Sequence, residues 1–153
     1  MKQLTWKLVL PLTIMSFATF TKWWYVLPVD GPDTMMTGFP LPFVCPGWHT
    51  SMSLQIFLTE FMIDILVFFV FWFLTTYCIN RYLKKLRVGK RLTIILLTIS
   101  GLVVTGAVII ASNSDNTFRT ERPWDMEVMT TDYKFIWQHQ ERPEFDKHAP
   151  SKE

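Results

Sequence analysis

The amino-acid sequence predicts an all-α integral membrane protein with three transmembrane helices, over about residues 8–27, 53–80 and 92–111. Half of the 153 residues are hydrophobic and 16% are aromatic, whereas only 18% are charged. This composition is more apolar than that of an ordinary soluble domain. Residues 65–80 and 92–114 contain no charged side chain. Because about 20 apolar residues span a bilayer, this pattern indicates two of the three helices.

The first predicted helix opens the chain with a basic start and an apolar core, as a secretory signal does. No A-x-A cleavage pattern follows Ala18, so we interpret residues 8–27 as an uncleaved signal anchor. Pro11 then lies in the first turn, where its missing amide costs least.

Basic residues set the expected orientation. The connection over residues 81–91 carries Arg81, Lys84, Lys85, Arg87, Lys90 and Arg91, whereas residues 28–52 contain no Lys or Arg. Cytoplasmic loops carry an excess of these residues. We therefore expect the N-terminus in the cytoplasm and the C-terminus outside it, which is the periplasm if the source is bacterial. The six cations are interpreted as a topogenic signal that contacts anionic lipid headgroups, and not as a nucleic-acid site.

The domain organisation that follows has two parts. Residues 1–112 form a three-helix membrane domain that includes the outer loop 28–52 and the basic cytoplasmic loop 81–91. Residues 113–153 form an extracytoplasmic tail, mostly irregular, with a weak strand signal over 128–137. The tail also holds a near-repeat, ERPWD and ERPEFD, which we interpret as chance.

The outer loop is rich in proline and glycine, and the alternating prolines of GFPLPF favour an extended path. It is nevertheless too apolar for a solvated linker. We therefore expect aromatic residues of the loop and the tail to bind partners, with these candidates: Phe39, Phe43, Trp48, Tyr133 and Trp137.

The third predicted helix carries the small residues Gly101, Thr105 and Gly106. Small residues let helices approach closely in lipid, where packing drives association. We expect this face to pack against the first two helices, and docking of a second copy or of a partner is the alternative.

Two carboxylates, Glu60 and Asp64, lie one helical turn apart in the second predicted helix. Counting back from its cytoplasmic end places Glu60 near the outer hydrocarbon boundary and Asp64 about 6 Å inside it. Lys22, in the first predicted helix, lies at a similar depth. Since an unpaired charge is costly in lipid, we predict that Lys22 pairs with Asp64 or else Glu60 and fixes the helix register. A path for ions or protons through the two carboxylates is the alternative.

Cys45 and His49, in the outer loop, superficially resemble a metal or nucleophile site. A metal needs three or four ligands, and a nucleophile needs an oriented base, and no sequence neighbour supplies them. Cys45 is free, lipid-modified or bonded to another chain, because Cys78 lies at the opposite membrane face. We expect no cofactor, and an enzyme with a Cys45 and His49 site is the least favoured function.

The leading functional prediction is a non-catalytic small subunit or scaffold of a larger membrane assembly. Its expected partners are membrane lipids and other membrane proteins, in a hetero-complex or a homo-oligomer, and not nucleic acid. The alternative is a small transporter or a component of an ion or proton path that uses Glu60 and Asp64.

Overall fold

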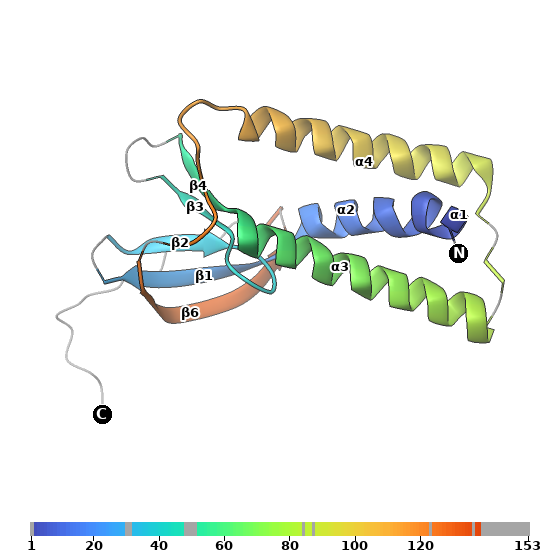
Figure 1. The fold of residues 1–153 in the computed structure, drawn as a ribbon, viewed down its shortest axis with the longest axis horizontal. Coiled ribbons are helices and arrows are strands. Elements are labelled where there is room, and N and C mark those ends of the chain that lie inside the picture. Colours follow the sequence, from blue (N-terminus) through green and yellow to red (C-terminus); the bar gives the residue numbers. More distant parts are fainter. Residues whose placement is uncertain are drawn as a thin grey trace.

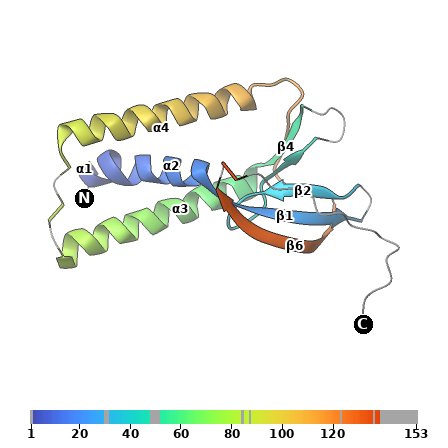
Figure 2. The ribbon, with the colours of Figure 1, turned by 180° about the vertical axis from the view of Figure 1, so that it is seen from behind.

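The computed structural model describes residues 2–29, 32–47, 52–83, 85–86, 88–122, 124–135 and 137–138. Three helical segments lie side by side, and a mixed sheet lies beyond one end of them (Figures 1 and 2). The sheet has six strands in the order β5-β4-β3-β2-β1-β6. The prediction of an all-α membrane protein with three spanning helices is therefore wrong.

The N-terminal segment changes from helix to strand in the middle of the predicted signal anchor. Helix α1 (Lys2–Leu4), the π-helical turn η1 (Thr5–Val9) and α2 (Leu10–Thr19) lead directly into β1 (Phe20–Pro28). The run FTKWWYVL is rich in aromatic and β-branched residues, which favour strands. The helix predicted over 8–27 therefore ends at Thr19, and the rest of that range belongs to the sheet.

The second predicted helix also begins with a strand. After β2 (Thr34–Thr37) and β3 (Val44–Pro46), strand β4 (Leu54–Phe57) leads directly into α3 (Leu58–Cys78). A π-helical turn, η2 (Ile79–Leu83), extends this helix beyond its predicted end. The third helix, predicted over 92–111, is present as α4 (Lys90–Ala111).

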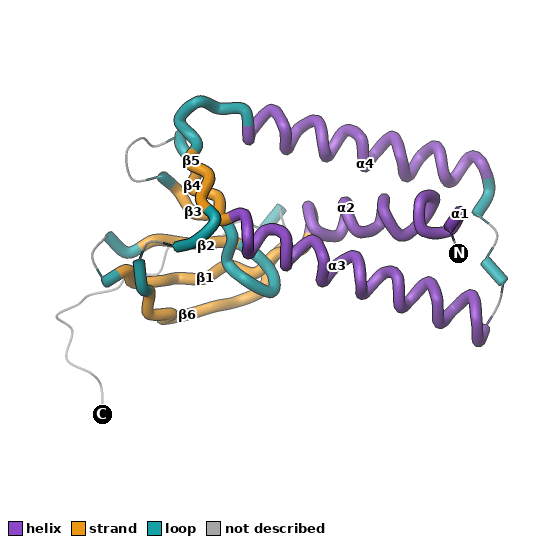
Figure 3. Tube along the Cα trace, in the orientation of Figure 1, coloured by secondary structure: helices purple, strands orange, loops and turns teal. Residues whose placement is uncertain are grey.

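The tail supplies both edge strands of the sheet, so the part of it that the structure describes is not mostly irregular. Strand β5 (Thr117–Arg119) pairs with β4 in parallel, and all other pairings are antiparallel. The connection from β4 to β5 therefore runs through α3 and α4 (Figure 3). Strand β6 (Met126–Phe135) pairs with β1 from Phe20↔Phe135 to Pro28↔Met126. It corresponds to the strand signal at 128–137.

The core of the sheet forms around four buried residues, Val26, Met36, Cys45 and Phe57, against which Trp24, Trp124 and Met126 pack. A register shift between Tyr25 and Val26 interrupts the alternation of β1, so that both of these neighbours are buried. Such a bulge places consecutive side chains in packed positions on one strand.

Helix α2 lies between the two longer helices and contacts both (Figure 1). Trp72 Nε1 of α3 donates a hydrogen bond to Ser16 Oγ at 2.8 Å, and Ser100 Oγ of α4 donates one to the Pro11 carbonyl at 3.3 Å. Among the described residues, two helical stretches are long and apolar enough to cross a membrane, Leu58–Leu83 and Lys90–Ala111. The structure therefore supports two candidate spans where the sequence predicted three.

Candidate functional site

The two carboxylates that the sequence singles out lie where the sheet meets the helices. Phe57, the last residue of β4, has an extended backbone, and α3 starts at the next residue. Glu60 is in the first turn, where the positive end of the helix dipole favours a negative charge. Asp64 follows one turn later and is 0% exposed. Both carboxylates are buried against segments that are distant in the sequence.

Glu60 forms an ion pair with the tail. Arg122 Nε donates a hydrogen bond to Glu60 Oε1 at 2.9 Å, and the Arg122 guanidinium also contacts Met126 Sδ at 3.2 Å. One residue before Glu60, Thr59 Oγ1 donates to the Thr120 carbonyl at 2.7 Å. The segment between β5 and β6 is thereby attached to the first turn of α3.

Asp64 binds the proline-rich segment GFPLPF. Its Oδ1 accepts the backbone N–H of Leu41 at 3.0 Å, and the backbone of Phe39 lies close to this carboxyl group. Pro40 and Pro42 have no N–H, so the donors of this segment are few. Phe43 N–H donates to the Thr37 carbonyl. The Asp64 carboxylate is therefore the hydrogen-bond acceptor of the Leu41 N–H in this proline-rich segment.

One oxygen of each carboxylate, Glu60 Oε2 and Asp64 Oδ2, is buried and has no hydrogen-bond partner in the described structure. Arg122 is the cation paired with Glu60, and no other ion pair joins described residues. Two acidic groups thus share a buried site with one paired cation. Uncompensated buried charge is unfavourable, so the unpartnered oxygens of this site carry a desolvation cost.

Lys22 lies on β1 and not on a membrane helix. Its Nζ is 3.8 Å from the centroid of the Trp24 ring and 5.6 Å from that of Tyr133. The sequence predicted an ion pair of Lys22 with Asp64 or Glu60. In the structure Arg122 lies beside Glu60, and the Lys22 ammonium lies over aromatic rings. The depth count that brought Lys22 to the carboxylates assumed a continuous helix, and the helix ends at Thr19.

The aromatic residues predicted to bind partners are partly used inside the chain. Phe39 packs on Phe20 and Phe68, and Phe43 packs on Phe17 and Phe61, with ring centroids 5.4–5.8 Å apart. They connect the loop to α2 and α3.

Two other candidates lie on the surface. Tyr133 stacks on Phe20, and Trp137 stacks on Phe135, yet both Tyr133 and Trp137 are exposed. Trp48 lies outside the described residues.

The small residues of α4 face open space. A Cβ added to Gly101 or Gly106 would meet no atom within 4 Å, and Thr105 bonds the carbonyl of Gly101 in its own helix. Within the described chain, α4 contacts α2 through Ser100. The packing expected of this face inside the chain is therefore not made at the two glycines.

The basic residues lie at the end of the helices opposite the sheet. Arg81 is in η2, Lys85 is in the linker, and Lys90 and Arg91 begin α4; all four are exposed. Lys84 and Arg87 lie outside the described residues.

Cys45 is buried in the sheet core, with its side chain 1% exposed. Burial raises the pKa of its thiol to about 11, against a smaller opposing effect of the Arg122 charge. The thiol is free, and Cys78 is free and exposed. His49 lies outside the described residues, and no three His, Cys, Asp or Glu of the described ranges gather to hold a metal ion.

Sequence reasoning missed Arg122, the residue that pairs with Glu60. Arg122 belongs to ERPWD, one copy of the near-repeat that we interpreted as chance. The tail holds several other basic residues, and nothing in the local pattern indicates a partner 62 residues away.

The fold and site together define a helical bundle that carries a mixed sheet at one end, with a buried acidic pair at their junction. The chain matches no known family model, no characterised protein and no solved structure.

Proposed function

We propose that the chain is a membrane-embedded accessory subunit, with α3 and α4 in lipid and the sheet at the membrane surface as a docking unit. The observation that carries this proposal is the exposure of apolar side chains on the two long helices. Leu102 and Ile109 of α4 are each 69% exposed, and Leu66 and Phe71 of α3 are more than half exposed. In water such continuous apolar surface is unfavourable, whereas lipid accommodates it.

Aromatic residues at both ends of the helices support this placement. Trp6 is 69% exposed and Tyr82 is 76% exposed at the end that carries the basic residues. Tyr133 and Trp137 are exposed at the sheet end. Tryptophan and tyrosine are enriched at the two membrane interfaces. The length of the helix also fits a bilayer, since the 26 residues of Leu58–Leu83 rise about 39 Å at 1.5 Å per residue.

The charge distribution supports one orientation. Residues 65–114 contain no Asp or Glu and include the six cations of the basic loop. All 13 acidic residues occur in residues 30–64 and 115–153. By the positive-inside rule, the basic end lies in the cytoplasm and the sheet lies outside it.

The accessory role is supported by the surface of the sheet. In the described chain, β6 is an edge strand with β1 on one side, so its other edge offers backbone groups for pairing. Its side chains Val128, Met129 and Tyr133 are exposed. An uncovered edge with apolar side chains is a template for strand addition by a partner protein.

The membrane placement is tested by a matched pair of lysine substitutions. Leu102→Lys, on the exposed face of α4, should prevent stable insertion or lower the yield in the carbonate-resistant membrane fraction. A charge in the hydrocarbon core costs about 3 kcal/mol. Thr130→Lys, on the exposed surface of β6, should leave that fraction unchanged. Greater solubility of Leu102→Lys, with the wild-type chain extracted by carbonate, would contradict the placement.

The accessory role is tested by gentle detergent extraction and native mass analysis. We expect the chain to run with at least one other protein. A monomer with no co-purifying chain would contradict the subunit proposal and would leave the membrane placement unaffected.

A second candidate function, a path for protons or small cations, is favoured by one observation, the two buried carboxylate oxygens without partners at Glu60 and Asp64. Its test is ion flux in liposomes that contain the full chain. Asp64→Asn should abolish flux, and the control Asp132→Asn, on exposed β6, should not. Wild-type flux in the Asp64→Asn variant would contradict this function.

A further inference from the structure

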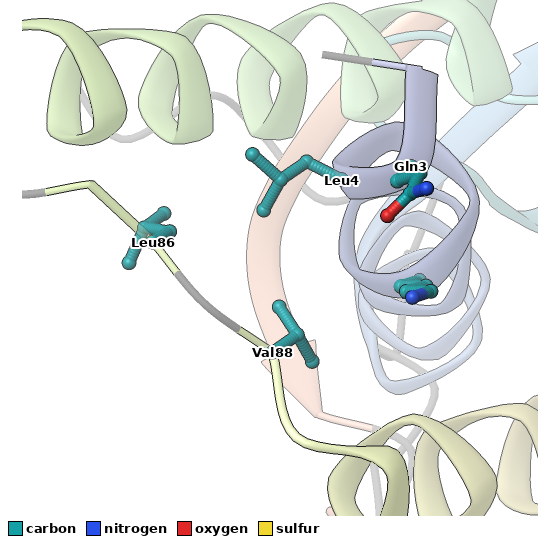
Figure 4. A pocket seen from close by; sticks show the side chains of 5 residues that line it. Gln3, Leu4, Leu86 and Val88 are labelled. Carbon is teal, nitrogen blue, oxygen red and sulfur yellow. The ribbon is translucent and has the colours of Figure 1, made fainter.

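A small cavity lies at the basic end of the bundle, far from the sheet. Gln3, Leu4 and Lys7 of the N-terminal helix line it on one side, and Leu86 and Val88 of the linker between η2 and α4 line it on the other (Figure 4). Its volume is about 230 Å³. The Leu86 N–H donates a hydrogen bond to Asn80 Oδ1 at 3.0 Å, which attaches the linker to η2.

The lining has two chemical halves. Leu4, Leu86 and Val88 supply aliphatic side chains directed toward the space between helix and linker (Figure 4). Gln3 and Lys7 supply an amide and an ammonium, which donate hydrogen bonds to an anion. A ligand that fits both halves is itself amphipathic and negatively charged.

The surroundings strengthen the attraction for an anion. Exposed Arg81, Lys85, Lys90 and Arg91 lie at the same end of the helices. Residues 1–29 and 65–114 contain no Asp or Glu, so no carboxylate from these ranges competes for Lys7. Clusters of cations beside a membrane attract anionic lipids.

The depth of the cavity matches the headgroup region. Trp6 directly precedes Lys7, and Tyr82 lies four residues before Leu86; both aromatic side chains are highly exposed. Exposed tryptophan and tyrosine mark the membrane interface.

We propose that this cavity binds one anionic phospholipid, with its phosphate at Lys7 and Gln3 and the start of an acyl chain along Leu4, Leu86 and Val88. The inference rests on the proposed membrane placement. It goes beyond a general attraction of the basic loop to the membrane, because it assigns a stoichiometric site to named residues. A free phosphate satisfies the polar half alone and leaves the aliphatic half exposed to water.

The test uses the full chain in nanodiscs with equal amounts of phosphatidylglycerol and phosphatidylcholine that share the same acyl chains. Native mass spectrometry should show one phosphatidylglycerol retained in preference to phosphatidylcholine. Lys7→Gln should lower this preference about tenfold, because one charge-assisted hydrogen bond is lost. Lys134→Gln, the same charge change on β6, should leave it unchanged.

A second substitution tests the aliphatic half. Val88→Asn keeps the charge and should also reduce retention of phosphatidylglycerol, since the acyl chain then meets a polar side chain. Unchanged retention in Val88→Asn would overturn the lipid site. So would equal losses in Lys7→Gln and Lys134→Gln, which indicate bulk charge, or displacement of the lipid by inorganic phosphate alone.

Incorporation into the discs separates the two proposals. A chain that enters the discs without preference for phosphatidylglycerol would refute the lipid site and leave the membrane placement standing. A chain that does not enter them would contradict both.

Discussion

At the scale of single residues, the Glu60 and Arg122 pair connects two regions that the sequence separates by 62 positions. The pair is largely shielded, with side-chain exposures of 11% and 22%. The net attraction of such a pair contributes little to stability. Removal of one partner is nevertheless costly, because it leaves the other charge buried and unpaired.

We predict that Arg122→Ala lowers the free energy of unfolding by about 2 kcal/mol, because the buried Glu60 carboxylate loses its ionic partner. Thermal or denaturant unfolding in detergent measures this effect. Arg119→Ala, at an exposed position of β5, is the matched control and should change stability little. A double-mutant cycle with Glu60→Gln should show positive coupling. Additive effects would rule out the pair as a stabilising contact.

The buried thiol of Cys45 gives a prediction about pH. Burial raises its pKa from 9.0 to about 11, so the folded state holds the proton over a range in which the unfolded state releases it. The protonated thiol therefore contributes its full stabilisation below about pH 9, and this stabilisation is lost as the pH rises toward about 11. We expect wild-type stability to fall over this window more steeply than that of Cys45→Ala. Parallel pH dependences of the two proteins would contradict the assignment.

At the scale of elements, the connection between β2 and β3 depends on Gly38. Its φ of 153° lies in the region that favours glycine, and a Cβ there would overlap the Leu41 carbonyl and lie 2.7 Å from the Phe43 nitrogen. This tight turn brings Phe39 and Leu41 to Asp64.

Gly38→Ala should therefore destabilise the protein by about 1–3 kcal/mol, through backbone strain and the displaced turn. Gly101→Ala is the matched control, because a Cβ at Gly101 meets nothing within 4 Å and alanine favours helix by about 1 kcal/mol. Unfolding midpoints of the two variants in the same detergent decide the matter. Equal effects would show that the turn tolerates a side chain.

How far the sequence predicts an element depends on whether its signal is local. Helix α4 was predicted within two residues at its start and exactly at its end, because its uncharged apolar run is continuous. Strand β1 was missed, since counting apolar length in residues 8–27 ignores the strand preference of Trp23, Trp24 and Tyr25. Its partner β6 lies about 100 residues further on, and no local pattern reports such a pairing.

The acidic site was predicted only in part, because only some of its contacts are local in the sequence. The spacing of Glu60 and Asp64 identified the two carboxylates, because i and i+4 neighbours share a helix face. Their partners, Arg122 and the backbone of Leu41, come from segments whose positions depend on the sheet. The predicted fold had no sheet and put Lys22 on a helix beside the two carboxylates, so Lys22 was predicted as their partner.

At the scale of the whole molecule, the separation of charge predicts an orientation that labelling can test. In a background without Cys45 and Cys78, Thr130→Cys places a thiol on exposed β6, and Lys85→Cys places one in the exposed linker. A membrane-impermeant maleimide should label the first in intact cells, or in spheroplasts of a bacterial host. It should label the second only after permeabilisation. The reverse pattern would invert the proposed orientation.

The pairing of β1 with β6 also sets an order of events during biosynthesis. Strand β1 is synthesised first and β6 last, yet the two share nine residue pairs along the full length of β1. The edge of β1 that faces β6 therefore stays open until the ribosome has made residue 135 and that segment has reached the same compartment. Both long helices must be synthesised and folded back in the meantime. Completion of the sheet thus requires that β6 has arrived, and a chain that stalls after α4 exposes an unpaired aromatic strand to chaperones and proteases.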